Sequence, residues 1–303
     1  MSSTMLQLVQ QVTNELGVTT PAVVAGSPNQ DVIQILALMN ASGYELLRRA
    51  DWQQLVHQKQ FSTEYLTTTG DWTTAARTIT NIPSTAGLDT TYQVVGTGIS
   101  NATYIESVDS STQVTVNQDF TEAGGTSATV DFQKVKYALP SDYLAMIPRT
   151  QWDKSKRWEL LGPEDAQQWQ WLLSGYIATG PRIRWRLIAN QFNIWPGNST
   201  AELLGYEYRS QGWAFNAAGT VMNSMTVDTD TCIYPDRLMV LSTKLKYFEA
   251  KGFDTTAIYR DYLMELDTAI AQDTSSANLS FAPRPSSILI GYDNIPDSGY
   301  GSS

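Results

Sequence analysis

Residues 182–195 read RIRWRLIANQFNIW, and this stretch does most to decide how the middle of the chain folds. Two runs within it, 182–189 and 192–195, have the aromatic and branched side chains that strands favour. A third run, 203–209, alternates Leu204, Tyr206 and Tyr208 with smaller or charged residues, as a strand with one buried face does. These runs predict a small β-sheet in this part of the chain.

Helical patterns lie at both ends of the sequence. Near the N-terminus, apolar residues recur at helical spacing over 5–16 and stop at Gly17, and a longer amphipathic segment covers 31–57. Near the C-terminus, 236–251 and 254–273 repeat apolar residues every three or four positions, and Asp254 precedes the second segment as a cap. We therefore predict N-terminal helices and a C-terminal helical hairpin.

Residues 61–136 differ in composition from both neighbouring parts. This zone is rich in Thr, Ser, Gly and Val, and short alternating runs are separated by turn residues, which indicates a small β-sandwich or barrel. Between 61 and 135 there are eight acidic residues and two basic ones, so eight minus two leaves a charge of −6. The change of composition at both edges predicts a domain inserted into another domain.

The fold class that follows is α+β, in four parts. Residues 1–60 supply the N-terminal helices, 61–136 the inserted β-domain, and 137–273 a helix, the strands and the helical hairpin. Residues 274–303 have no helical period and contain three prolines, so we expect an extended C-terminal tail. An isolated apolar cluster in the tail, Ile288, Leu289 and Ile290, predicts that it docks on something.

The charge and the cysteine content exclude several classes of protein. The 303-residue chain carries a formal net charge of −10, with a sequence pI near 4.6, which argues against a dedicated nucleic-acid binder. Cys232 is the only cysteine, so we expect no intrachain disulfide and a buried, unreactive thiol. No basic segment with an apolar run follows Met1, and no stretch approaches the roughly 18 apolar residues of a membrane span. Assembly in the cytoplasm is therefore expected.

Candidate catalytic residues are few. His57 is the only histidine, and it lies far in sequence from Cys232, so no Ser-His-Asp or Cys-His set can be assembled. The Gly96-Thr97-Gly98 run lacks the remaining glycines of a phosphate-binding loop. Asp228 and Asp230 could offer two oxygens to a cation, but a solvated turn is the better interpretation. We expect no enzyme, no metal site and no cofactor.

Tryptophan is concentrated between residues 139 and 215. Seven of the nine tryptophans lie there: Trp152, Trp158, Trp169, Trp171, Trp185, Trp195 and Trp213. Many would fill a core, but Trp169 and Trp171 are two apart on a helix that is predicted to begin at Pro163, and they cannot share a face. Arg182, Arg184 and Arg186 alternate on one strand face, and we expect them to pair with carboxylates of this subunit or of a neighbour. Because Trp and Arg are enriched at interfaces, Trp171 and these arginines are our candidate intersubunit contacts.

A series of short motifs in this region occurs in a characteristic order. They are Leu139-Pro140-Ser141-Asp142-Tyr143, Trp152-Asp153, Leu161-Gly162-Pro163-Glu164, Trp169, Ile188-Ala189-Asn190-Gln191-Phe192-Asn193-Ile194-Trp195-Pro196, Leu204-Gly205-Tyr206-Glu207-Tyr208-Arg209-Ser210, Trp213, Asp228-Thr229-Asp230 and Gly252-Phe253-Asp254. Read together, they resemble the head-to-tail adaptor, connector or head-completion proteins of tailed bacteriophages. With the N-terminal helices, the similarity spans most of the chain.

The resemblance implies a helical adaptor core that forms a dodecameric ring in the virion. One face of the ring would bind the portal protein and the other a tail or nozzle protein, while double-stranded DNA passes through the lumen without specific binding during genome ejection. No catalysis, cofactor or membrane contact is implied. By similarity, the tail is the candidate for the portal contact, through Phe281, Ile288, Leu289, Ile290 and Tyr292.

Two other functions remain open from the sequence. The chain could be another virion component, such as a tail-fibre or receptor-binding module that holds carbohydrate on its β insert. Exposed Trp and Tyr side chains stack on sugars, yet most of the tryptophans lie outside the insert. An enzyme such as a cell-wall hydrolase would need paired carboxylates, and no Glu/Asp pair stands out.

Overall fold

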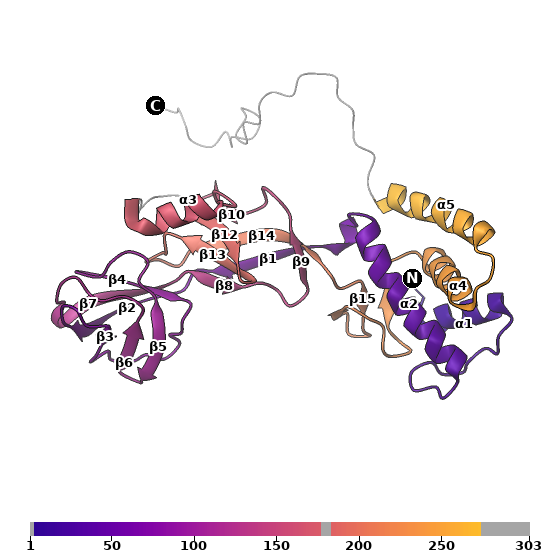
Figure 1. The fold of residues 1–303 in the computed structure, drawn as a ribbon, viewed down its shortest axis with the longest axis horizontal. Coiled ribbons are helices and arrows are strands. Elements are labelled where there is room, and N and C mark those ends of the chain that lie inside the picture. The colour runs from indigo at the N-terminus through magenta and orange to yellow at the C-terminus, as the bar shows by residue number, and fades with distance from the viewer. Residues whose placement is uncertain (1–2, 177–182, 274–303) are drawn as a thin grey trace, which may run out of the picture.

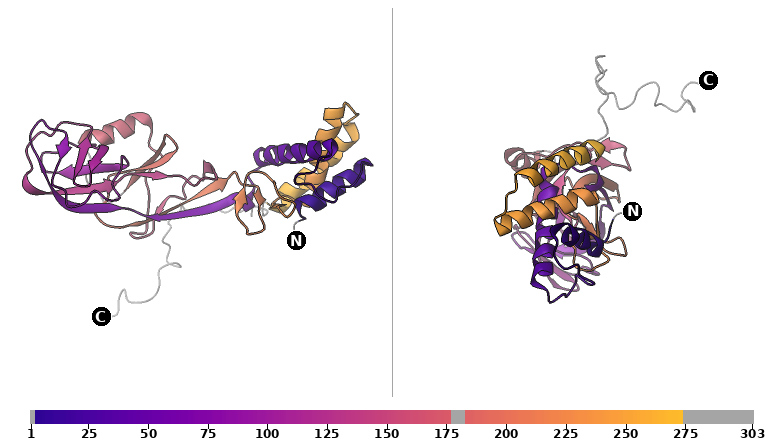
Figure 2. Two further views of the ribbon diagram at one scale, coloured as in Figure 1. Left: turned by 90° about the horizontal axis from the view of Figure 1, so that it is seen from below. Right: turned by 90° about the vertical axis from the view of Figure 1, so that its right-hand side faces the viewer.

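The molecule is elongated. The computed structural model describes residues 3–176 and 183–273. Within them, the long helices gather at one end, and antiparallel sheets form the middle and the other end (Figure 1). Strands β1 (Val56–Ser62) and β14 (Leu203–Ser210) link the two ends (Figure 2).

The helical end is organised around one central helix. α4 packs against the other three and lies between α5 and the N-terminal helices (Figure 2). Local sequence sets the limits of the first helix, because the Thr4 side chain accepts a hydrogen bond from the Gln7 backbone N–H and Gly17 ends the helix with φ of 70°. The helices of this end are α1 (Met5–Leu16), α2 (Gln30–Arg49), α4 (Asp236–Lys251) and α5 (Thr256–Asp273).

A close contact fixes α2 against the segment that follows β14. Gly43 faces the ring of the fully buried Trp213, and a Cβ at Gly43 would lie 2.3 Å from that ring. The Tyr234 hydroxyl donates a hydrogen bond to the Gly43 carbonyl at 3.1 Å, and its ring stacks on Trp213. A small sheet lies beside this contact, made of β15 (Ala214–Phe215), β16 (Val221–Met222) and β17 (Thr231–Cys232).

Strands β1 and β14 form a long antiparallel pair. All of β1 pairs, from Val56 opposite Arg209 to Ser62 opposite Leu203. Alternation along β14 buries Leu204, Tyr206 and Tyr208 on one face. The other edge of β14 holds β9 (Tyr143–Met146) and β10 (Trp152–Asp153), and β11 (Trp158–Glu159) extends the sheet.

A second sheet covers the buried face of β14. It consists of β12 (Arg184–Ile188), β13 (Gln191–Trp195) and β8 (Lys136–Ala138). Between the two sheets, the ring of Phe192 stacks on Trp185 and Tyr206, with centroids 5.3 and 5.0 Å apart. A short helix, α3 (Ala166–Trp171), continues into a π-helical turn, η2 (Leu172–Tyr176), and packs on Trp195.

The far end consists of two sheets around a separate core. One sheet has the order β2 (Tyr65–Trp72), β7 (Gly125–Lys134), β4 (Tyr92–Gly96), and the other has the order β3 (Thr78–Ile79), β6 (Gln113–Val116), β5 (Ile105–Ser110). Their shared core includes Trp72, Val114 and Phe132. Gly124 lies so close to Trp72 that a Cβ there would come within 2.2 Å of its ring.

The expected fold class is wrong. Strands hold 31% of the described residues and helices 30%, and the strands form several antiparallel sheets, so a helical adaptor core with a small sheet attached is not what the chain builds. The reason is that the strands bury aromatic side chains against one another and make cores of their own instead of covering the helices. The expected C-terminal tail, 274–303, lies outside the described residues.

Two expected helices also have different limits. The segment expected over 31–57 ends as a helix at Arg49, and a 3₁₀ turn, η1 (Gln53–Leu55), leads into β1. Trp52 is buried there, and its indole N–H donates to the Leu46 carbonyl at 2.7 Å. His57 therefore lies in a strand and not at a helix end. Similarly, α3 begins after Asp165, whose carboxylate accepts the Gln168 N–H, and not at Pro163.

Candidate functional site

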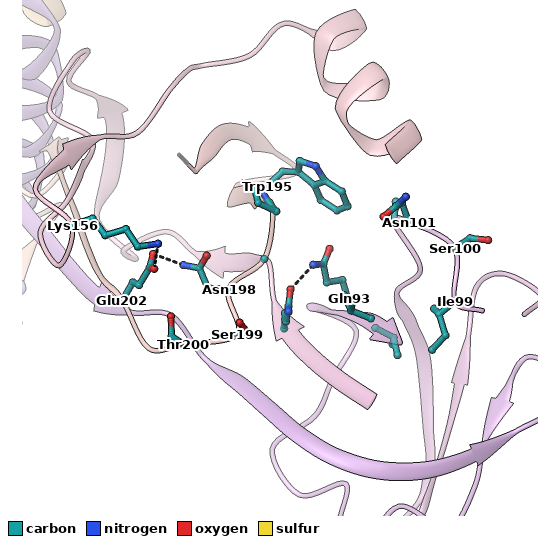
Figure 3. Close-up of a pocket in the computed structure, with 16 residues that line it drawn as sticks. Gln93, Ile99, Ser100, Asn101, Lys156, Trp195, Asn198, Ser199, Thr200 and Glu202 are labelled. Atoms are coloured by element: carbon teal, nitrogen blue, oxygen red, sulfur yellow. Dashed lines mark hydrogen bonds and ion pairs between the residues drawn. The ribbon is translucent and has the colours of Figure 1, made fainter. Parts of the chain in front are cut away.

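A polar cleft lies where the far end of the molecule meets the middle sheets. One wall comes from β4 and the loop after it, and the other from the segment that follows β13 (Figure 3). The cavity volume is about 300 Å³. Amide and hydroxyl side chains dominate the lining, which includes Gln93, Ser100, Asn101, Gln133, Asn198, Ser199 and Thr200.

Gln93 is the most unusual residue of this cleft. It lies opposite Gln133 in the β4–β7 ladder and is only 4% exposed. Its Nε2 donates a hydrogen bond to Gln133 Oε1 at 2.8 Å, but within the described part of the chain its own Oε1 has no partner. An unpaired buried carbonyl is costly, so the cleft is suited to a water or a ligand that donates a hydrogen bond.

The opposite wall holds a charged pair, Lys156 and Glu202. Glu202 is 4% exposed and forms an ion pair with Lys156. The same carboxylate accepts a hydrogen bond from Asn198 Nδ2 at 2.7 Å (Figure 3). Both charges are thus compensated inside the chain, and the cleft presents neutral hydrogen-bonding groups instead of a catalytic acid or base.

Trp195 borders the cleft but offers no open aromatic face. It is 2% exposed and belongs to a small core with Trp169 and Leu172. A flat sugar ring would need an exposed aromatic surface to stack on. A neighbouring, wider depression shares Ser100, Asn101 and Ala102 with the cleft and reaches Gln170 on α3.

The candidate catalytic residues from the sequence do not meet at this cleft. His57 lies in β1 opposite Tyr208, and its Nε2 is buried without a partner among the described residues. Cys232 is 3% exposed, and burial raises the pKa of its thiol to about 12. A neutral, inaccessible thiol is a poor nucleophile, in line with the prediction of a buried, unreactive cysteine.

Asp228 and Asp230 are structural, and the expected solvated turn is wrong for Asp230, which is 1% exposed. Asp228 accepts hydrogen bonds from the backbone N–H groups of Val24 and Ala25, the latter at 2.7 Å. Asp230 accepts from the N–H groups of Thr226 and Val227, both at 2.7 Å. Their oxygens hold two loops together.

The candidate intersubunit residues are only partly brought together. Arg184 pairs with Glu164 of the same chain at 2.6 Å, and Arg186 donates to the Asp165 carbonyl at 3.3 Å. Both side chains thereby hold the start of α3 against β12. Trp171 is 45% exposed on α3, whereas Trp169 is buried. Arg182 lies outside the described residues, as do the tail candidates Phe281, Ile288, Leu289, Ile290 and Tyr292.

Two exposed helix faces escaped the sequence analysis. On α2, the outer face carries Ile33 and Tyr44, and on α5 it carries Leu263 and Met264. The helical period of each segment is visible in the sequence, but the apolar residues off the main stripe could not be assigned to the surface without the packing of α4. The same holds for the Gln93 cleft, whose two walls are about a hundred residues apart.

Two further kinds of site concern metal ions and membranes, within residues 3–176 and 183–273. There, no group of three or more His, Cys, Asp or Glu side chains is arranged to hold a metal ion. Nor does any helix in these ranges have the length and apolar character that crossing a bilayer requires. No protein-family model matches the chain, and no curated protein is a significant match.

Proposed function

We propose that this protein is a non-enzymatic structural subunit of a tailed-phage virion, a head-to-tail adaptor that forms a ring between the portal and the tail. The proposal starts from the resemblance of the motifs between Leu139 and Trp213 to such adaptors. Several of these motif residues are buried framework, since Phe192, Tyr206 and Trp213 each fill a core. A motif set that serves packing fits an assembly subunit better than a catalyst.

The two-ended shape is the observation that carries the proposal. The chain is a rod with helices at one end, sheets at the other and the β1–β14 pair between them (Figures 1 and 2). A subunit that joins two different partners needs two chemically different ends held at a fixed separation. Copies arranged side by side around an axis would make a ring with one partner at each end.

The charge distribution is compatible with a DNA channel. In the far end of the rod, Asp89, Glu106, Asp109, Asp119 and Glu122 are all exposed. Carboxylates repel the phosphate backbone, so an acidic lumen would let DNA pass without holding it. The ring we propose therefore conducts double-stranded DNA and does not bind it.

The experiment that tests this function is negative-stain imaging of the purified protein mixed with the portal oligomer of the same virion. We expect a monomer or weak associate alone and a ring stacked on the portal in the mixture. A stable trimer in solution that does not bind the portal would overturn the proposal. DNA binding can be measured in parallel, and tight binding at physiological salt would contradict an open acidic lumen.

A carbohydrate-binding receptor module is the second candidate, and the neutral cleft is the one observation in its favour. Its amides and hydroxyls, with the unpaired Gln93 carbonyl, match the groups of a polyol. The buried Trp195 counts against it. A glycan array would decide, with Asn101→Ala and Asn198→Ala as cleft variants: a glycan signal that both variants abolish would favour this function over the adaptor.

A further inference from the structure

The helical end carries two exposed faces that fit each other. On α2, the residues opposite the buried stripe are Ile33, Ala37, Ala41, Tyr44 and Arg48, all of them exposed. On α5, they are Thr256, Arg260, Leu263, Met264 and Asp267, also all exposed. We call these sets the α2 face and the α5 face. α4 packs against both α2 and α5, so the buried stripe of each helix lies toward α4 and the two sets of exposed residues lie away from it.

Both faces are more apolar than a solvated helix surface requires. Ile33 and Tyr44 are 46% and 41% exposed, and Leu263 and Met264 are 37% and 65% exposed. Ala37 and Ala41 lie between Ile33 and Tyr44 on the α2 face. Their small side chains leave a shallow groove, into which the longer side chains of another helix can fit. Large exposed apolar side chains in a row, rimmed by charge, are typical of interaction surfaces.

The two faces share one register. When α2 and α5 are laid parallel with Tyr44 opposite Leu263, Ala41 falls opposite Arg260 and Ala37 opposite Thr256. The same register places Arg48 opposite Asp267. Within the described residues, neither of these two charged side chains has an ion-pair partner, so each can pair with the other. In this alignment the large side chains of Tyr44 and Leu263 lie opposite each other, and the small Ala41 lies opposite the long Arg260. The positive charge of Arg48 lies opposite the negative charge of Asp267.

We propose that the α2 face of one copy of this chain binds the α5 face of the next copy, in parallel register, with Tyr44 packed against Leu263 and Arg48 paired with Asp267. Two different faces make a heterologous contact, which repeats from copy to copy and closes into a ring when the rotation permits. Both α2 and α5 run from the outer part of the helical end toward the middle of the rod, at different inclinations to its long axis (Figure 1). The rotation from one copy to the next must therefore bring α5 parallel to the neighbouring α2, as the register requires. The closure of these contacts into a ring rests on the proposed function. The contact itself is inferred from the exposed residues of the α2 face and the α5 face.

The test is disulfide trapping in the full-length chain. Tyr44→Cys combined with Leu263→Cys should give a ladder of covalent dimers, trimers and higher multimers under mild oxidation, because one thiol lies on each face. Ala37→Cys combined with Thr256→Cys should do the same. The buried native Cys232 does not interfere.

Matched controls separate this contact from others. Tyr44→Cys combined with Thr256→Cys places the thiols about 10 Å out of register, beyond the ~7 Å between Cα atoms that a disulfide spans, and should give no ladder. Each single-cysteine variant should stay monomeric, and a single variant that forms dimers efficiently would indicate a symmetric contact and overturn the proposal. An intramolecular bridge in the Tyr44/Leu263 pair, or no multimers up to about 1 mM protein, would also overturn it.

Charge reversal provides a second readout. Arg48→Glu or Asp267→Arg alone should lower the trapped yield of the Tyr44/Leu263 cysteine pair about two- to fivefold, and the two together should restore it. Equal losses in the single and combined variants would contradict the proposed pairing. If the ladder forms but the protein does not join the portal, the contact stands and the adaptor function fails. If portal-bound rings form while the cysteine pairs do not cross-link, the adaptor function stands and the proposed contact between the α2 face and the α5 face fails.

Discussion

At the scale of single residues, two carboxylates, the partly buried Asp228 and the buried Asp230, hold backbone N–H groups in place. Asp228 holds the N–H groups of Val24 and Ala25, which lie about two hundred residues away in the sequence. Asp230 holds its own turn and is buried. Charged hydrogen bonds of this kind are stronger than neutral ones, so these two side chains help to fix the helical end.

Removal of the Asp228 carboxylate should destabilise the fold. In Asp228→Ala, the Val24 and Ala25 N–H groups lose their acceptor, and we expect the free energy of unfolding to fall by about 1–3 kcal/mol. Asp261→Ala is the matched control, because Asp261 is exposed on α5 and its removal should change the stability by less than about 0.5 kcal/mol. Urea denaturation followed by tryptophan fluorescence measures both. Equal stabilities of the two variants would contradict the fastening role.

The Cys232 thiol should be unreactive in the native protein. Burial raises its pKa to about 12, so at pH 8 the thiol is protonated and shielded from solvent. Because the thiolate is the reacting form, a colorimetric disulfide reagent should label the native chain very slowly and the unfolded chain at once. Rapid stoichiometric labelling without denaturant would show that the segment around β17 opens readily.

At the scale of elements, α2 and α4 are joined by an ion-pair group at their surface. Glu45 accepts from Lys246 of α4 and pairs with Arg49 on its own helix. Glu15 of α1 likewise pairs with Lys244 and Arg237 of α4. Apolar packing sets the contact between these helices, and the carboxylates add a dependence on pH.

Acidification should weaken the α2–α4 contact through Glu45. Hydrogen bonds from Lys246 and then Arg49 lower the pKa of this carboxyl below its ordinary 4.5. A lowered pKa contributes stability above the ordinary pKa, and that contribution is lost as the pH falls through the folded-state pKa. Because the group is partly exposed, we expect about 0.5 kcal/mol from it at pH 7. Glu45→Gln should therefore be less stable than wild type at pH 7, and the gap should shrink as the pH falls below 4.5 in urea titrations. A gap that does not shrink on acidification would assign the effect to packing.

At the scale of the whole molecule, the chain is a rod whose two ends have separate cores. The helical core runs from Met5 to Ala269 in sequence, whereas the core of the far end uses only residues between Trp72 and Phe132. Both sets of core residues lie before Asp273 in the sequence. Folding and partner binding can therefore be separated by experiment.

Deletion of residues 274–303 should leave the fold intact and abolish the portal binding that we propose. Asp273 is retained in this variant, because its carboxylate accepts the Gln53 N–H at 2.6 Å. Thermal unfolding should be nearly unchanged, and co-sedimentation with the portal oligomer should be lost. A full-length control with Ile288→Ser, Leu289→Ser and Ile290→Ser should also lose binding, since these apolar residues are the predicted contact. If either variant binds the portal as well as the wild type does, the portal contact lies outside the tail residues changed in that variant.

The sequence by itself determined the local features of this protein. Thr4 caps the start of α1 and Gly17 ends it, through hydrogen bonds between residues a few positions apart. The alternation of Leu204, Tyr206 and Tyr208 is likewise a local periodicity. The tertiary structure alone decided that β1 pairs with β14, that Gln93 faces Glu202 across a cleft, and that the outer faces of α2 and α5 remain uncovered. Those outcomes depend on contacts between residues a hundred or more positions apart, and no local pattern specifies which distant surface a strand or helix will meet.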